Sequence, residues 1–188
     1  MFKNIINNLL NDDLFNEKKL VKLVSKDKYS RSDIYNYNNH FIIKKWNNKP
    51  MEHNKDLNNS ILFYKELNIY KRLKDYDFIP KLLYYDENEF IIIINFCGEH
   101  LKLKDVNKKV LYKFEEILKI LKNKKIKHND LAKVSSIDSN GMKCAKYFTN
   151  ILINNEKIFI IDFEWSTEND EESIKHRNYN DNDIIFKI

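Results

Sequence analysis

The sequence has few of the residues that cross-link a chain, bind zinc or cross a membrane. Its two cysteines, Cys97 and Cys144, lie neither in a CxxC pair nor at metal-ligand spacing from a histidine. A disulfide framework and a zinc site are therefore not indicated, and a reduced, cytoplasmic setting fits best. No apolar run approaches the roughly 20 residues of a membrane span. The start, "MFKNIINNLLNDD", is too polar for a signal peptide, so we expect no membrane partner.

Glycine and proline are also scarce, with two of each in 188 residues, while asparagine, lysine and isoleucine are abundant. This bias is typical of an AT-rich genome, so a single asparagine carries little weight. The 33 basic and 28 acidic residues give a net charge of +5 that is dispersed along the chain and does not form a basic tail. We expect one globular domain with a sizeable core, a mild preference for anionic ligands, and no nucleic acid partner.

The periodicity of the first half predicts strands interrupted by helices. Alternating or continuous apolar runs indicate strands, and apolar residues at helical spacing indicate helices. The expected elements are a helix over 2–10, a strand over 20–24, a hairpin over 34–43 around Asn38 and Asn39, a helix over 60–74 capped by Ser60, and a hairpin over 81–96.

The second half contains one long helical pattern, over residues 105–123. Two short strands, 150–153 and 157–163, follow it, and then a polar tail. Residues 132–148 combine serine, asparagine, aspartate and glycine without a long apolar period, so we expect a mobile loop there. The chain is therefore expected to be an α+β protein, with a strand-rich front half and a mainly helical back half joined at 95–98.

Several polar residues stand where strands end or on the helix between them. An enzyme that transfers a phosphoryl group needs a cation on the phosphates, oxygen ligands for Mg²⁺, and a carboxylate beside the attacking hydroxyl. Each group alone is an ordinary surface residue, and Lys45 is an alternative to Lys44. The order along the chain carries the inference: Lys44, Glu66, Asp130 in "HND", Asn150 in "NILI", and Asp162 in "IIDFEWS".

The stretches "FIIK", "KELNIYKRL", "FIIIINFCGEHL", "KIKHND", "NILI" and "IIDFEWS" occur in the order seen in the protein-kinase-like superfamily. The chain resembles its choline/ethanolamine kinase and aminoglycoside phosphotransferase branch most, and its small size is similar to that of the RIO atypical kinases. The resemblance implies a two-lobed fold. An antiparallel-sheet N-lobe with one helix would cover about 1–95, a hinge 95–98, and a reduced, mainly helical C-lobe 98–188.

The resemblance also implies an activity, a Mg²⁺-dependent ATP phosphotransferase acting on an alcohol group of a small molecule or a protein. Asp130 would accept the proton of the acceptor hydroxyl, and Glu164 is an extra carboxylate near the acceptor. The other implied roles are Lys44 on the α and β phosphates, Glu66 orienting Lys44, Asn150 and Asp162 on Mg²⁺, Phe96 and Cys97 beside the adenine, and Ser30 and Ser32 near the phosphates.

Two features depart from the family. The stretch "YSRSDIYNY", which corresponds to the phosphate loop, contains no glycine, so the backbone cannot approach phosphate as closely. Asp130 and Asn150 are 20 positions apart, whereas protein kinases place these residues about five positions apart. Ser135 stands at the expected offset, but Asn150 precedes the apolar strand and is preferred. These departures suggest the alternative of a weak or inactive pseudokinase that acts as a binding or scaffold module.

Overall fold

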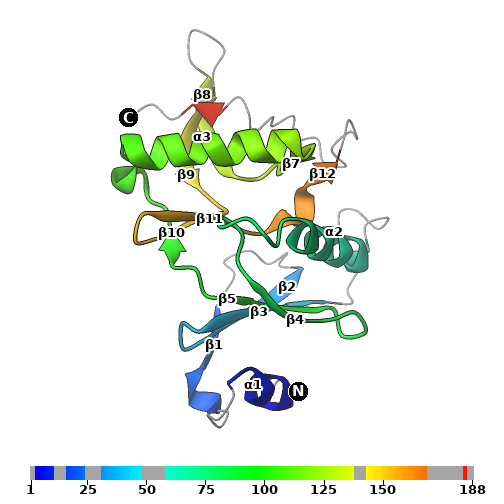
Figure 1. Ribbon diagram of the computed structural model, residues 1–188. Coiled ribbons are helices and arrows are strands. Elements are labelled where there is room, and N and C mark those ends of the chain that lie inside the picture. The colour runs from blue at the N-terminus through cyan, green and yellow to red at the C-terminus, as the bar shows by residue number, and fades with distance from the viewer. Residues whose placement is uncertain are drawn as a thin grey trace. The chain divides into compact units, whose positions relative to one another are not determined.

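The chain forms an α+β structure with three α-helices and several small sheets in its described part (Figure 1). The computed structural model describes residues 3–10, 16–23, 31–47, 58–137, 143–168 and 184–185. The chain divides into two compact units, one made of residues 1–63 and 81–96 and the other of residues 64–80 and 97–188. Within the described ranges, no helix is both long and apolar enough to cross a membrane.

The first unit contains a five-stranded antiparallel sheet with the order β1-β2-β3-β5-β4. Asn38 and Asn39 form the turn between β2 and β3 with φ of 48° and 55°, a conformation that asparagine tolerates better than most residues. The bounds are β1 Leu20–Leu23, β2 Ser32–Tyr37, β3 Phe41–Trp46, β4 Leu82–Asp86 and β5 Ile91–Asn95, with the 3₁₀ turn η1 at Glu17–Lys19.

One cluster of the core of this unit lies on one face of the sheet. Helix α1 (Lys3–Leu9) contributes Ile6, which is fully buried. The rings of Tyr37 and Phe41 stack with their centres 5.0 Å apart, and Ile43, Ile91 and Ile93 complete the cluster. Strand β5 is buried on both faces, which explains its continuous apolar run.

Helix α2 (Asn59–Arg72) begins in the first unit and continues into the second. The predicted cap, Ser60, is wrong. The backbone N–H of Ser60 donates to the side-chain oxygen of Asn58 at 3.1 Å, so Asn58 takes the capping role one residue before the helix begins. Ser60 itself lies inside the first turn.

The second unit is built mainly from short strands around one long helix. Three sheets have the orders β11-β10-β6, β12-β7 and β13-β9-β8, and every pairing is antiparallel except that of β13 with β9. The bounds are β6 Glu99–His100, η2 Leu103–Asp105, α3 Lys108–Asn123, β7 Ile126–Lys127, β8 Ala132–Ile137, β9 Lys143–Phe148, β10 Ile151–Asn154, β11 Lys157–Ile160, η3 Phe163–Trp165, β12 Thr167–Glu168 and β13 Ile184–Ile185.

The expected two-lobed kinase-like fold with a mainly helical C-lobe is wrong. In the described part of 97–188, α3 is the one α-helix, and the remaining elements are strands and 3₁₀ turns. Helical periodicity extends only along α3, whose buried face carries Val110, Phe114, Ile117 and Leu121. The residues after it are short runs rich in isoleucine and phenylalanine separated by turn residues, a composition that favours strands.

Residues 132–148, expected to form a mobile loop, contain strands β8 and β9, which pair as an antiparallel hairpin, while the mobility itself stays a prediction. The pairing begins at Ala132 and Phe148 and shifts register on both sides of Val134. Such shifts leave the alternation of apolar and polar residues irregular, so the usual period-2 signal of a strand is weak.

Candidate functional site

Three carboxylates of the second unit gather into what we call the acidic cluster, Glu66, Asp162 and Glu164. One carboxylate oxygen from each lies within 4.8 Å of the other two. Glu66 is 2% exposed and Glu164 5% exposed, whereas Asp162 is half-buried. Like charges this close repel one another, and burial strengthens the repulsion, so the arrangement favours binding of a cation.

The backbone at Asp162 directs the chain into this cluster. Asp162 follows the end of β11 and adopts a left-handed conformation with φ of 63° and ψ of 60°. It precedes η3 without capping that turn through its side chain. A non-glycine residue in this region is uncommon and is often found at functional sites. The bend brings the carboxylates of Asp162 and Glu164 close to the carboxylate of Glu66 on α2.

His128 connects the "HND" segment to the residue before Asp162. Its Nε2 lies 2.8 Å from the carbonyl oxygen of Ile161, and its Nδ1 accepts from the backbone N–H of Asp130 at 3.3 Å. Because a carbonyl only accepts and an N–H only donates, both contacts are satisfied by a neutral imidazole with its proton on Nε2. The ring also packs on Phe163, with the ring centres 4.8 Å apart.

Asp130 and Asn150 lie in direct contact although 20 positions separate them. The side-chain amide of Asn150 donates to the backbone carbonyl of Asp130 at 2.7 Å and to its carboxylate at 3.3 Å. The β8–β9 hairpin begins after Leu131 and ends before Thr149. The N–H of Thr149 donates to the Leu131 carbonyl at 3.0 Å, which closes the base of the hairpin. Asp130 and Asn150 therefore stay in contact despite the long insertion between them. The side chain of Ser135, the alternative to Asn150, lies outside the described residues.

The Asp130–Asn150 pair is also tied to the strand that leads to Asp162. The N–H of Ile161 donates to the carbonyl of Asn150 at 3.1 Å. Ile161 is thus held by His128 through its carbonyl and by Asn150 through its N–H. Two backbone bonds at one residue fix the path of the chain next to Asp162.

Further contacts hold the segment that carries Glu164. The side-chain amide of Asn129 donates to the Trp165 carbonyl and to the Thr167 hydroxyl, both at 3.0 Å. The ring of Tyr70 on α2 meets the ring of Phe163 edge-on at 6.0 Å. The segment from 163 to 167 is buried, so this part of the site is preorganised.

Lys44 lies in the first unit, on β3 between Ile34 of β2 and Ile92 of β5. It is 9% exposed, and its Nζ lies 4.6 Å from the centre of the Trp46 ring. Lys45, the alternative, forms an exposed ion pair with Glu89 at 3.1 Å. Lys44 and Glu66 belong to different units, so the pairing between them stays a prediction.

The residues predicted to contact the nucleotide are placed as follows. Ser32 is buried at the start of β2, and Ser30 lies outside the described residues. The N–H of Phe96 donates to the carbonyl of His40 at 3.0 Å, and Cys97 is buried. No ligand contact follows from these positions, and the adenine and phosphate assignments stay predictions.

Two positioning residues and one grouping were not predicted from the sequence. His128 and Asn129 were given no role, although both are part of the "HND" segment. Glu66 was expected beside a lysine and was not grouped with Asp162 and Glu164. A polar triplet between two apolar runs was the available signal for buried, hydrogen-bonded side chains, since buried polar groups need partners.

Comparison with known proteins assigns no family: no protein-family model matches the chain, and no curated protein matches it.

The donor set of the acidic cluster fits Mg²⁺ better than zinc. Mg²⁺ prefers oxygen ligands at about 2.1 Å, so two oxygens on one ion lie about 3.0 Å apart when adjacent and about 4.2 Å apart when opposite. The spacing within 4.8 Å is compatible with this geometry after small side-chain adjustments. Zinc favours cysteine and histidine, and both ring nitrogens of His128 already meet backbone groups.

Proposed function

We propose that the chain is a Mg²⁺-dependent ATP phosphotransferase that acts on a hydroxyl group of a small molecule or a protein. The observation that carries the proposal is the contact between Asp130 and Asn150, linked through Ile161 to the acidic cluster. This arrangement supplies a carboxylate for proton transfer and a group of oxygen ligands in one unit. The order of the matching sequence segments supports phosphoryl transfer over other metal-dependent chemistry.

Asp162 and Glu164 are the proposed carboxylate ligands of Mg²⁺, and the side-chain oxygen of Asn150 is a third. The amide nitrogen of Asn150 already donates to Asp130, which orients the amide. When bound, Mg²⁺ would offset the negative charge of the phosphates. Glu66 adds the third negative charge of the acidic cluster. The scarcity of cysteine supports a cytoplasmic setting.

Asp130 is the proposed general base. Its carboxylate would accept the proton of the acceptor hydroxyl as the oxygen attacks the terminal phosphorus of ATP and ADP leaves. The bonds from Asn150 and Thr149 to the Asp130 carbonyl hold its backbone in place. Thr149 and Asn150, which follow the β8–β9 hairpin, therefore contribute mainly by orienting this carboxylate.

The first experiment is a thermal-shift scan with ATP and Mg²⁺, added separately and together. A stabilisation by ATP that requires Mg²⁺ supports the proposal, because a ligand that binds only the folded state raises its apparent stability. Transfer from labelled ATP is then screened over choline, ethanolamine, aminoglycosides and generic proteins. ATP binding without transfer to any acceptor would favour the alternative, a binding or scaffold module. The absence of glycine from "YSRSDIYNY", the stretch that corresponds to the phosphate loop, also suggests this alternative.

Asp162→Asn tests the metal assignment. The change removes one charge from the acidic cluster and keeps the side-chain size, so Mg²⁺-dependent stabilisation and phosphotransfer should both be lost while the fold persists. Asp105→Asn, an exposed change at the end of η2, is the matched control. Wild-type turnover in Asp162→Asn would refute the metal role of Asp162.

A further inference from the structure

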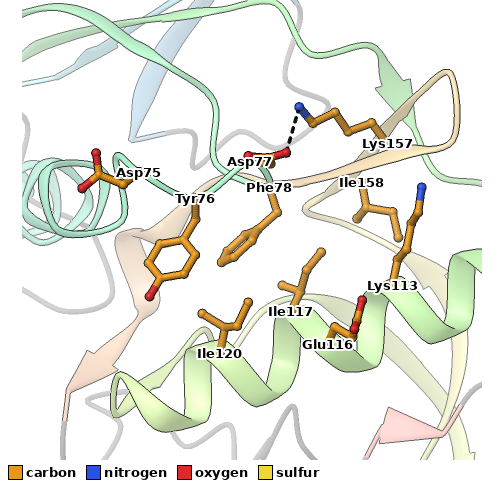
Figure 2. A pocket seen from close by; sticks show the side chains of 10 residues that line it. All are labelled: Asp75, Tyr76, Asp77, Phe78, Lys113, Glu116, Ile117, Ile120, Lys157 and Ile158. Carbon is orange, nitrogen blue, oxygen red and sulfur yellow. Dashed lines mark ion pairs between the residues drawn. The ribbon is translucent and has the colours of Figure 1, made fainter.

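A cavity lies in the second unit, lined by none of the residues assigned above. Its volume is about 380 Å³, and its walls are the 75–78 loop, helix α3 and strand β11. Figure 2 shows Ile117 and Ile120 pointing from α3 towards the rings of Phe78 and Tyr76. We call this cavity the α3 pocket. Its volume is within the range of pockets that bind small organic molecules.

The floor of the α3 pocket is apolar. Phe78, Ile117 and Ile158 are buried, and Tyr76 and Ile120 are half-buried. The Tyr76 and Phe78 rings lie 5.5 Å apart and are tilted by 42°. An aromatic or branched apolar group would gain contact with both rings and the isoleucine side chains.

The two lysines at the rim are already engaged. Lys157 Nζ forms an ion pair with Asp77 at 3.6 Å, the dashed line in Figure 2. Lys113 Nζ donates to the carbonyl of Glu156 at 2.9 Å. Both ammonium groups keep their charge, but each is held by a partner, and the lining as a whole carries three carboxylates, those of Asp75, Asp77 and Glu116, against these two lysines.

The remaining rim charges are carboxylates. Neither Asp75 nor Glu116 has a hydrogen bond or ion pair within the described residues, and both are exposed. The ring of Tyr76 is already contacted by Lys124, whose Nζ lies 5.6 Å from the ring centre. The preference for a cationic ligand group over an anionic one therefore rests on the carboxylates of the rim.

The wall of the α3 pocket is connected to two of the acidic residues. The 75–78 loop follows α2, which carries Glu66. The carbonyl of Phe78 accepts from the N–H of Ile160 at 2.9 Å, two residues before Asp162. A ligand that moves Phe78 thus acts on both elements that supply the acidic cluster.

We propose that the α3 pocket is a regulatory site for a small molecule with an apolar body and one ammonium group. The apolar body lies on the isoleucine and aromatic floor, and the ammonium group faces Glu116 or Asp75. Binding alters the acidic cluster through Phe78 and Ile160. The regulatory role rests on the proposed function, whereas binding itself does not.

The test of binding uses three probes with the same ring, namely phenethylamine, 2-phenylethanol and phenylacetate, titrated by NMR against the full chain. We expect chemical-shift changes at the pocket residues, with phenethylamine bound about tenfold more tightly than phenylacetate. Glu116→Gln should weaken phenethylamine about threefold, because an exposed ion pair contributes little. Glu115→Gln, at the neighbouring exposed position outside the pocket, should leave binding unchanged.

No binding of phenethylamine at 10 mM, on the order of the weakest useful fragment affinities, would overturn the pocket. Equal affinity for phenethylamine and phenylacetate would overturn the ligand class. The Mg²⁺ affinity of the chain is then measured with and without saturating phenethylamine, and a change of about fivefold or more is expected. An unchanged Mg²⁺ affinity would overturn the regulatory role, whereas absence of Mg²⁺ binding without amine would overturn the proposed function.

Discussion

Asp130 combines two constraints in a single residue. Its backbone carbonyl accepts from both Thr149 and Asn150, while its backbone N–H donates to His128. The carboxylate is therefore attached to a backbone held on both sides. A proton acceptor positioned in this way needs little rearrangement before reaction.

Asp130→Asn should separate proton transfer from binding. The amide keeps the size and still accepts from Asn150 but cannot take a proton, so turnover should fall by about 10²–10⁴-fold. Nucleotide binding should persist, which a titration with ATP and Mg²⁺ would measure. Joint loss of binding and turnover would instead indicate that Asp130 maintains the structure.

Lys44 and Lys45 provide a residue-scale comparison on one strand. If Lys44 holds the nucleotide phosphates, as the resemblance implies, Lys44→Met should lower turnover about 10²-fold and raise the ATP concentration required. Lys45→Met removes an exposed ion pair with Glu89 and should have little effect. Steady-state kinetics on both variants decides between them, and the reverse ranking would transfer the role to Lys45.

At the scale of elements, α3 is joined to the turn between β10 and β11. Glu156 in this turn forms an ion pair with Lys109, and its carbonyl accepts from Lys113 at 2.9 Å. The hydrogen bond from Lys109 holds the pKa of the Glu156 carboxyl below its ordinary value of 4.5. The helix and the hairpin are thus linked at a solvent-exposed point.

This contact predicts a pH dependence with a definite sign. Because the pKa is lowered in the folded state, the contribution of Glu156 to stability is present above pH 4.5 and is lost as the pH falls through the lower folded value. An NMR titration of the Glu156 carboxyl should give a midpoint below 4.5 that moves back towards 4.5 in Lys109→Met. Lys108→Met should leave the midpoint in place, and a shift in that control would argue against a specific pair.

At the scale of the whole molecule, Gly98 allows two segments of the second unit to approach closely. Its φ is 103°, and an added Cβ would lie 2.3 Å from the carbonyl oxygen of Ile153. Strand β6 follows at once and pairs with β10 through Glu99 and Ile153. A side chain at this position would therefore disturb the β11-β10-β6 sheet.

Gly98→Ala should destabilise the protein by about 2 kcal/mol or more, because it combines backbone strain with a clash against backbone atoms. Urea unfolding followed by circular dichroism measures the loss. Glu99→Ala, at the adjacent exposed position, is the control and should change stability by less than about 0.5 kcal/mol. Wild-type stability of Gly98→Ala would show that this approach is not tight in solution.

Local sequence signals determined much of the secondary structure. Period-2 patterns and the Asn38–Asn39 pair predicted the hairpin of β2 and β3, and helical spacing predicted α3. The four buried isoleucines of β5 were evident as one apolar run. These features depend on neighbouring residues, and so the sequence alone indicates them.

The tertiary structure decided the rest. The approach of Asp130 to Asn150 depends on the pairing of Ala132 with Phe148 across an intervening hairpin. The grouping of Glu66 with Asp162 joins segments nearly 100 positions apart. Neither of these two contacts produces a periodic pattern in the sequence. Strand pairing and the burial of charge depend on contacts between residues that are too far apart in the sequence for any local window to include both.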